Sequence, residues 1–215
     1  MSLIAKNEGG VEIKQLEPGV YTGIAGAIVD LGIQENSMFG NKQRKIIIVW
    51  QIVGENIEVN GEILPRLISK EYTLSLSEKS TLRKDLQAWR GKAFTQEELK
   101  GFDLINILNV PCQLQIIQNE KNGKVYTSIA GIMAIPKGMQ VQKLEETIIF
   151  DTYDATTWDN LLKIPKWIIE KIKKCLNQSE TGLDIFIKDF EALQEEQAGK
   201  QNEDINEEDK KDLPF

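Results

Sequence analysis

The chain contains no histidine, which removes the commonest general base near neutral pH and a frequent metal ligand. Serine–histidine and cysteine–histidine catalysis are excluded with it. Cysteine is scarce as well: Cys112 and Cys175 are the only two in 215 residues, and no C-x-x-C motif occurs. The two thiols can form one disulfide, but two small buried thiols are the expected arrangement.

Long apolar runs are also missing. No stretch approaches the roughly 18 apolar residues that a membrane-spanning helix needs, and residues 1–8 do not have the pattern of a signal peptide. The glycine patterns of nucleotide-binding loops do not occur. We therefore expect a cytoplasmic protein with no membrane partner, no cofactor and no resident metal.

Charge is distributed unevenly along the chain. The formal net charge is −7, and residues 191–215 hold nine acidic and three basic residues, so the rest of the chain is nearly neutral. The polar composition of residues 194–212 predicts a disordered acidic tail. The tail ends in Asp212, Leu213, Pro214 and Phe215, and an aromatic residue beside a free carboxylate suits a pocket with a basic rim. The alternative is that these four residues stand at the chain end by chance.

Apolar, β-branched segments and glycine turns predict a mainly β protein. The expected strands are residues 20–34, 44–53, 64–75, 110–119 and 124–135. Asn-Gly pairs at 60–61 and 122–123 predict two tight hairpins. The first strand is expected to bend at Gly23, Gly26 or Gly32, because glycine inside a strand marks a bulge or a bend.

A helix is predicted between the third and fourth strands. Leu82, Leu86 and Trp89 are spaced to share one helix face, with Ser77 as the expected N-cap and Gly91 as the stop. A capping box at 95–98 opens a short second helix. This order of elements is that of the OB-fold, a five-stranded Greek-key barrel.

Four regions follow from this pattern. They are an N-terminal segment (1–17), an OB-fold domain (18–136), a helical extension (137–193) and a disordered acidic tail (194–215). The extension carries helical patterns at 158–162, 164–176 and 183–193, with apolar residues on one side. A helix docked on the barrel is favoured over one that lies on a membrane.

We find no catalytic constellation, so a binding protein is expected rather than an enzyme. Binding single-stranded nucleic acid requires cations for the phosphates and rings on which bases stack. Alternation in the third strand places Arg66, Lys70 and Tyr72 on one face. The candidate DNA-contacting residues are Lys42, Arg44, Lys45, Trp50, Lys70, Tyr72 and Tyr126, with Arg83, Lys84 and Arg90 as a second group. For Trp50 and Tyr72, burial in the core is the alternative.

Two stretches resemble known proteins. The run from Tyr72 to Thr95, with matches at 101–104 and 123–126, resembles single-stranded-DNA-binding proteins of phages and prophages of Gram-positive bacteria, over about residues 18–136. Separately, Asp212 to Phe215 resemble the tail of bacterial single-stranded-DNA-binding proteins, although Lys210 and Lys211 interrupt the acidic run. The resemblance implies a tail that recruits replication, recombination and repair enzymes.

The expected function is coating and protection of single-stranded DNA, without sequence preference, in phage replication or recombination. A homo-oligomer fits this role. The alternatives are a strand-annealing recombination mediator and an OB-fold protein–protein adaptor, which the nearly neutral body favours. A nuclease using Asp151 and Asp154 as metal ligands is a further alternative, but their neighbours suggest a surface turn and a helix cap.

Overall fold

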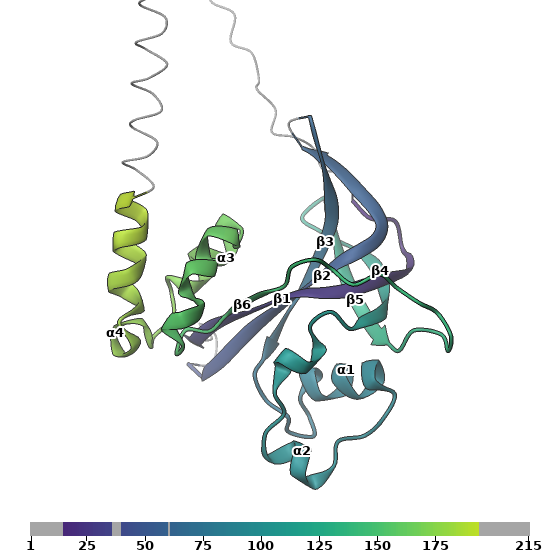
Figure 1. The fold of residues 1–215 in the computed structure, drawn as a ribbon, viewed down its shortest axis with the longest axis horizontal. Coiled ribbons are helices and arrows are strands. Elements are labelled where there is room, and N and C mark those ends of the chain that lie inside the picture. Colours follow the sequence, from purple (N-terminus) through teal and green to yellow (C-terminus); the bar gives the residue numbers. More distant parts are fainter. Residues whose placement is uncertain (1–14, 36–39, 60, 194–215) are drawn as a thin grey trace, which may run out of the picture.

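A curled antiparallel sheet forms the centre of the protein, with helices beside and below it (Figure 1). The computed structural model describes residues 15–35, 40–59 and 61–193. The strands are β1 (Gly19–Glu35), β2 (Lys42–Val59), β3 (Glu62–Thr73), β4 (Pro111–Lys121), β5 (Lys124–Met133) and β6 (Ile148–Phe150). The helices are α1 (Thr81–Arg90), α2 (Gln96–Lys100), η1 (Leu104–Ile107), η2 (Ala155–Lys163), α3 (Lys166–Ile172) and α4 (Gln178–Thr181), and residues 183–193 are also helical.

The strands follow the path β3-β2-β1-β4-β5, with each neighbouring pair antiparallel, and β6 adds to β1 in parallel. β3 and β5 are the two ends of this path, and no hydrogen-bonded ladder joins them within the described part of the chain. The sheet is therefore a half-barrel that stays open between β3 and β5. The prediction of a mainly β fold with added helices is confirmed at this level.

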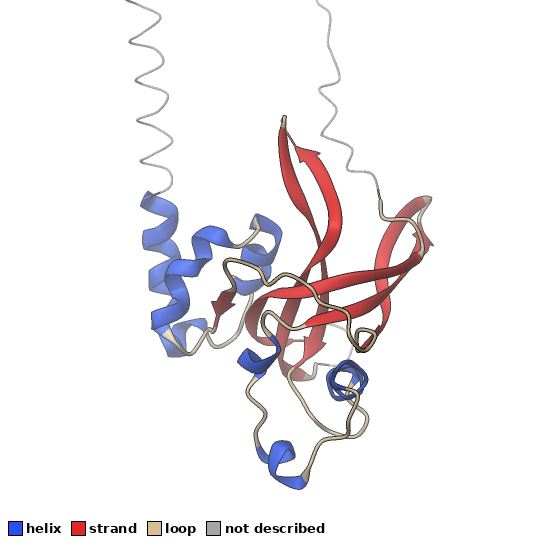
Figure 2. Ribbon diagram, turned by 45° about the vertical axis from the view of Figure 1, so that its right-hand side comes forward, coloured by secondary structure: helices blue, strands red, loops and turns tan. Residues whose placement is uncertain are grey.

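Both predicted hairpins are present, and each connects its strands through two residues. Val59 pairs with Glu62, with Gly61 at φ +84°, although Asn60 itself lies outside the described residues. In the other turn, Asn122 and Gly123 have φ of +55° and +72°, the left-handed conformation that a tight hairpin requires. The β2–β3 hairpin projects from the body as an arm (Figure 2).

β1 bends at two of the three predicted glycines. Its register with β2 shifts between Ala25 and Ala27, around Gly26, and again between Asp30 and Ile33, around Gly32. Gly32 has φ +67°, and a Cβ atom there would lie 2.4 Å from Oδ1 of Asn177. The second bend therefore needs glycine both for its backbone conformation and for the close approach of the C-terminal extension.

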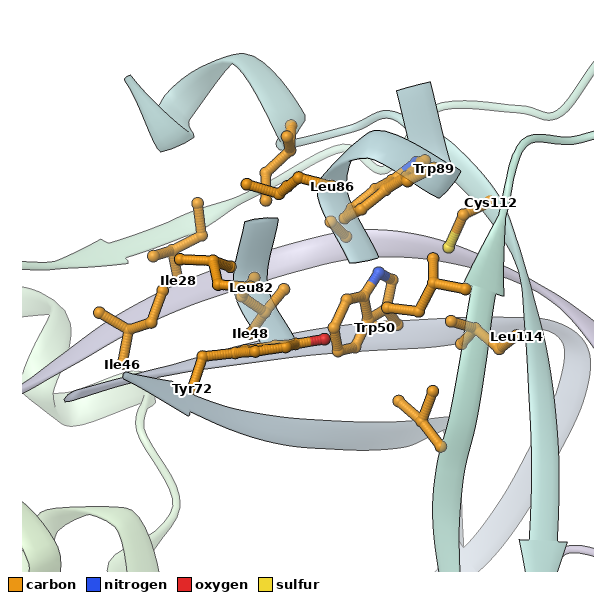
Figure 3. Packing of buried hydrophobic residues seen from close by; sticks show 14 of the residues in the cluster. Ile28, Ile46, Ile48, Trp50, Tyr72, Leu82, Leu86, Trp89, Cys112 and Leu114 are labelled. Carbon is orange, nitrogen blue, oxygen red and sulfur yellow. The ribbon is translucent and has the colours of Figure 1, made fainter. Parts of the chain in front are cut away.

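The first core lies between the inner face of the sheet and α1. Leu82, Leu86 and Trp89 are buried as predicted, and they pack against Trp50 and Tyr72 (Figure 3). The rings of Trp50 and Trp89 lie 5.8 Å apart between centroids, in a tilted arrangement. This core fixes α1 across the base of the half-barrel.

The ends of α1 and α2 are set by local capping. Ser80, not Ser77, is the N-cap of α1, because its side chain accepts a hydrogen bond from the Arg83 backbone one turn further on. Gly91 ends α1 at φ +66°, as predicted. The capping box of Thr95 and Glu98 at the start of α2 is also confirmed.

A second core lies on the outer face of the same strands. Val29, Leu31 and Ile47 point away from the first core and are fully covered by the C-terminal extension. The extension contributes Phe150, Trp158, Leu161, Ile164, Ile168, Ile172, Cys175, Leu183 and Ile187. β1 and β2 are thus buried on both faces, which explains the continuous apolar run at 46–50. β1 and β2 therefore contribute one face to the first core and the other face to the core under the extension.

Candidate functional site

The opening between β3 and β5 is a groove with a volume of about 600 Å³, which we call the β3–β5 groove. One wall comes from the two strand edges and the other from the start of α3. Its lining residues are Gln15, Leu16, Val49, Arg66, Leu67, Ile68, Ser69, Tyr126, Thr127, Pro165, Trp167 and Ile168. Leu16 is buried there and fills part of the open side of the barrel core.

Arg66 is the most unusual residue of the groove. It is 9% exposed, yet within the described ranges no carboxylate lies within ion-pair distance of its guanidinium. A buried cation without a counter-charge is costly, and proteins normally pair it. Arg66 lines an open groove and has no carboxylate partner among the described residues, so its guanidinium suits a ligand with negative charge or strong hydrogen-bond acceptors.

Two aromatic rings from different parts of the chain border the same groove. Tyr126 of β5 is 50% exposed and Trp167 of α3 is 51% exposed. The other three tryptophans of the chain, Trp50, Trp89 and Trp158, are at most 8% exposed. The groove is therefore lined by half-exposed aromatic rings from both the barrel and the extension, together with Arg66.

A second cleft, of about 570 Å³, lies further along β3. We call it the polar cleft. It is lined by Gln43, Lys45, Lys70, Glu71, Tyr72, Thr73, Ser75, Ser77, Lys79, Ser80 and Thr81. Hydroxyl and ammonium groups dominate this lining, and both groups donate hydrogen bonds to phosphate oxygens.

Glu71 lines the polar cleft and binds two lysines. Its Oε1 lies 2.8 Å from Nζ of Lys45, and its Oε2 lies 2.6 Å from Nζ of Lys171. Burial raises the pKa of Glu71, but hydrogen bonds from Lys171 and Lys45 outweigh it, so the pKa falls below its ordinary value. The ammonium of Lys171 also lies 5.7 Å from the centre of the Trp167 ring, within cation–π range.

The structure corrects the expectation that Trp50 and Tyr72 are exposed stacking platforms. Their exposed fractions are 0% and 3%, and Figure 3 shows both rings within the core. Tyr72 donates a hydrogen bond to Asp85 of α1, and Lys70 binds the same carboxylate oxygen. Burial and the charge of Asp85 raise the pKa of Tyr72. Lys70 and Tyr72 do share one face of β3, as their alternation predicts, but this face points toward the core and α1.

Arg44 is likewise a structural residue. Its guanidinium binds Asp30 at 2.9 Å and Asp151 at 2.6 Å, and it lies 4.6 Å from the centre of the Tyr153 ring. Burial lowers the pKa of Arg44, but the hydrogen bond and charge of Asp30 outweigh it and raise the pKa. With both carboxylates in place, Arg44 is not available for DNA in this structure, contrary to the prediction.

Of the second group of predicted cations, Arg83 and Arg90 make structural contacts, whereas Lys84 is exposed. Arg83 donates to the Leu76 carbonyl and to Gln87, and Arg90 binds Glu98 and stacks on Phe94 and Phe102. These contacts hold the loops around α1. The remaining predicted residues reach the surface: Lys42 and Lys84 are exposed, Lys45 lines the polar cleft, and Tyr126 lines the β3–β5 groove.

The predicted tail residues Asp212, Leu213, Pro214 and Phe215 lie outside the described residues. Of the two carboxylates considered for a nuclease, Asp151 binds Arg44 and Asp154 caps η2. Across residues 15–35, 40–59 and 61–193, no group of three or more His, Cys, Asp or Glu side chains is placed to hold a metal ion.

Sequence reasoning did not select Trp167, Arg66 or Glu71 for the site. Trp167 had a usable signal, because it falls beside the apolar stripe of Ile164, Ile168 and Ile172 instead of on it. Glu71 had no such signal in the sequence, because the two lysines that bind it are 26 and 100 positions away along the chain.

No family model matches this chain, and no curated protein matches it in sequence. In the described part of the chain, no helix is both long and apolar enough to cross a membrane.

Proposed function

We propose that this chain is an OB-fold protein that binds single-stranded DNA, without sequence preference, in the β3–β5 groove. One observation carries the proposal: Arg66, a largely buried residue with no carboxylate within ion-pair distance among the described residues, lines the same open groove as two half-exposed rings, Tyr126 and Trp167. Unpaired bases stack on such rings, while a cation takes a phosphate or a base edge. Duplex DNA presents no free base faces and should bind weakly.

The sheet path supports the OB-fold. In a closed five-stranded Greek-key barrel with this strand order, pairing between β3 and β5 closes the barrel. Here those strands form the open side, and α1 between β3 and β4 covers the base of the barrel. The binding surface known for this fold lies over strands 2 and 3 and the loops beside them. Both hollows are lined by β3, and the polar cleft also by the start of β2, whereas the extension covers the outer face of β2 around Ile47.

The test is a titration with oligo-dT against duplex of the same length, at two salt concentrations. Tryptophan emission reports binding, because Trp167 is the one tryptophan of the four with a large exposed surface. We expect quenching with oligo-dT, weaker binding at high salt, and little response to duplex. Absence of oligo-dT binding, checked by gel shift, would refute the proposal.

Variants locate the site, with labelled DNA as the reporter. Tyr126→Leu and Trp167→Leu should each weaken binding by about 1–3 kcal/mol, or roughly 5- to 150-fold. Tyr153→Leu is the matched control, since Tyr153 is 46% exposed but lines neither cleft. If all three variants bind as the wild type does, the DNA binds elsewhere and the groove is the wrong site.

Arg66→Gln separates a ligand-binding role from a structural one. Among the described residues this charge has no carboxylate partner, so replacing it with a neutral side chain should leave the free energy of unfolding unchanged or raise it. The same change should weaken binding of oligo-dT. A variant that loses stability and keeps full affinity would show that Arg66 is only structural.

By the resemblance of residues 72–95 and of the chain end, the protein would act in phage replication or recombination and recruit enzymes through residues 212–215. Deleting those four residues should leave oligo-dT affinity intact and abolish capture of host replication proteins. A strand-annealing mediator would bind equally well, but it would form rings or filaments and accelerate pairing of complementary strands.

A protein–protein adaptor is the second candidate, and the edges of β3 and β5, which pair with no further strand among the described residues, favour it. An extended peptide adds readily to a strand edge that lacks a partner. This function leads if neither oligo-dT nor duplex binds.

A further inference from the structure

The β3–β5 groove and the polar cleft follow one strand, β3, from Arg66 to its end at Thr73. Residues 66–69 of β3 line the groove, and residues 70–73 line the cleft. At about 3.3 Å per residue, these eight positions extend over about 26 Å. The two hollows are thus successive parts of one surface along β3, rather than separate pockets.

Glu71 lies in the polar cleft, two positions after Ser69 of the groove, and its carboxylate ties three elements together. Lys45 comes from β2, Glu71 from β3 and Lys171 from α3, and each lysine binds a different carboxylate oxygen. All three side chains keep about a third of their surface exposed, between 30% and 42%. A ligand can therefore reach this cluster from solvent.

The chemistry of the cluster suits exchange with a phosphate. A carboxylate in the middle of the surface repels a polyanion, but it also holds two ammonium groups at the point where a backbone would pass. Partly exposed ion pairs contribute little net free energy, so a phosphate can replace the carboxylate at small cost. Lys171 remains beside the Trp167 ring, so a phosphate bound to it would lie next to a stacked base.

We propose that single-stranded DNA runs along β3 past Glu71, where its phosphates take Lys45 and Lys171 from the carboxylate and so join both hollows into one continuous binding track. The inference rests on the proposed DNA-binding function and adds the path of the strand and a residue that opposes it. Glu71 then weakens binding, although it lies inside the binding surface.

The experiment compares Glu71→Gln with Lys171→Gln, using labelled oligo-dT over a series of salt concentrations. Removing the carboxylate frees two lysines, so Glu71→Gln should bind about three- to tenfold more tightly at low salt. The slope of log K against log salt should stay close to that of the wild type, because both lysines already contact phosphates in the wild-type complex. Lys171→Gln should bind more weakly and with a shallower slope.

The opposite signs are the decisive part of this test. If Glu71 served only to hold α3 against β3, both substitutions would break the same ion pair and change affinity in the same direction. Glu97→Gln is the matched control: it removes one negative charge and breaks the Glu97–Lys100 pair on α2, outside both hollows. It should change affinity less than twofold and leave the salt slope unchanged.

The outcomes separate the two proposals. If the wild type binds oligo-dT and Glu71→Gln binds equally or more weakly, the path past Glu71 is refuted while DNA binding stands. If neither protein binds, both proposals fail. Circular dichroism and thermal unfolding of each variant show that the comparison is made between folded proteins.

Discussion

Asp30 connects the barrel to the C-terminal extension, and replacing it should destabilise both. Its carboxylate is 4% exposed. It accepts hydrogen bonds from Nε and Nη2 of Arg44 at 3.1 and 2.9 Å, and from the backbone amides of Gly32 and Thr152 at 3.1 Å each. The Thr152 hydroxyl donates to it as well. Asp30→Asn removes the charge and turns an amide NH₂ toward groups that are themselves donors.

The expected loss follows from these contacts. Removing one partner of a buried ion pair costs about 3–5 kcal/mol. Arg44 keeps Asp151 at 2.6 Å, and its side chain is 33% exposed, so the loss should lie at or just below the lower end of this range, at about 2–3 kcal/mol. With a urea m-value of about 2 kcal/mol/M, the unfolding midpoint should fall by about 1–1.5 M.

Urea unfolding followed by tryptophan emission measures this shift, with Asp154→Asn as the control. Asp154 caps η2 at the surface, and asparagine is an equally good N-cap, so that variant should lose less than about 0.5 kcal/mol. A loss below about 1 kcal/mol for Asp30→Asn would refute the reasoning, because the carboxylate would then not organise this junction.

Three further predictions concern other residues. Gly32→Ala should lower the free energy of unfolding by more than about 1 kcal/mol, because φ is +67° and the new Cβ would meet Asn177 and Cys175; urea unfolding measures it. Both thiols are free and buried, and burial raises the pKa of Cys112 to about 12, so a thiol reagent should label neither cysteine until urea unfolds the chain. The lowered pKa of Glu71 means that its contribution to stability is present above the unfolded-state pKa and is lost as pH falls through the folded one; an acid titration of Glu71→Gln should lack this part.

Local signals in the sequence were enough to predict the elements of the barrel. The stripe of Leu82, Leu86 and Trp89, the stop at Gly91 and the turn at Asn122-Gly123 each depend on residues within a few positions of one another. Such patterns specify local conformation almost independently of the rest of the fold. The five strands of the half-barrel and α1 were therefore predictable, with errors mainly in strand length.

The site was less predictable, because it depends on contacts between distant parts of the chain. Alternation places Arg66 and Tyr72 on one face of β3, but it does not say which face turns inward. The run at 46–50 is apolar on both sides because the extension covers its outer face, so Trp50 could not be distinguished from a surface ring by pattern alone. Trp167 reaches the groove only because α3 docks beside β3.

The double covering of β1 and β2 also has a consequence for how the chain folds. The outer face of these strands, around residues 29–47, is covered by residues 148–187, so its cover is synthesised more than 100 positions later. Contacts between residues so far apart in the sequence form slowly, because the chain loses the entropy of closing a long loop before the contacts contribute favourable free energy. A nascent or truncated chain that ends near residue 136 would expose Val29, Leu31 and Ile47, and it would tend to associate with other chains or chaperones until the extension arrives.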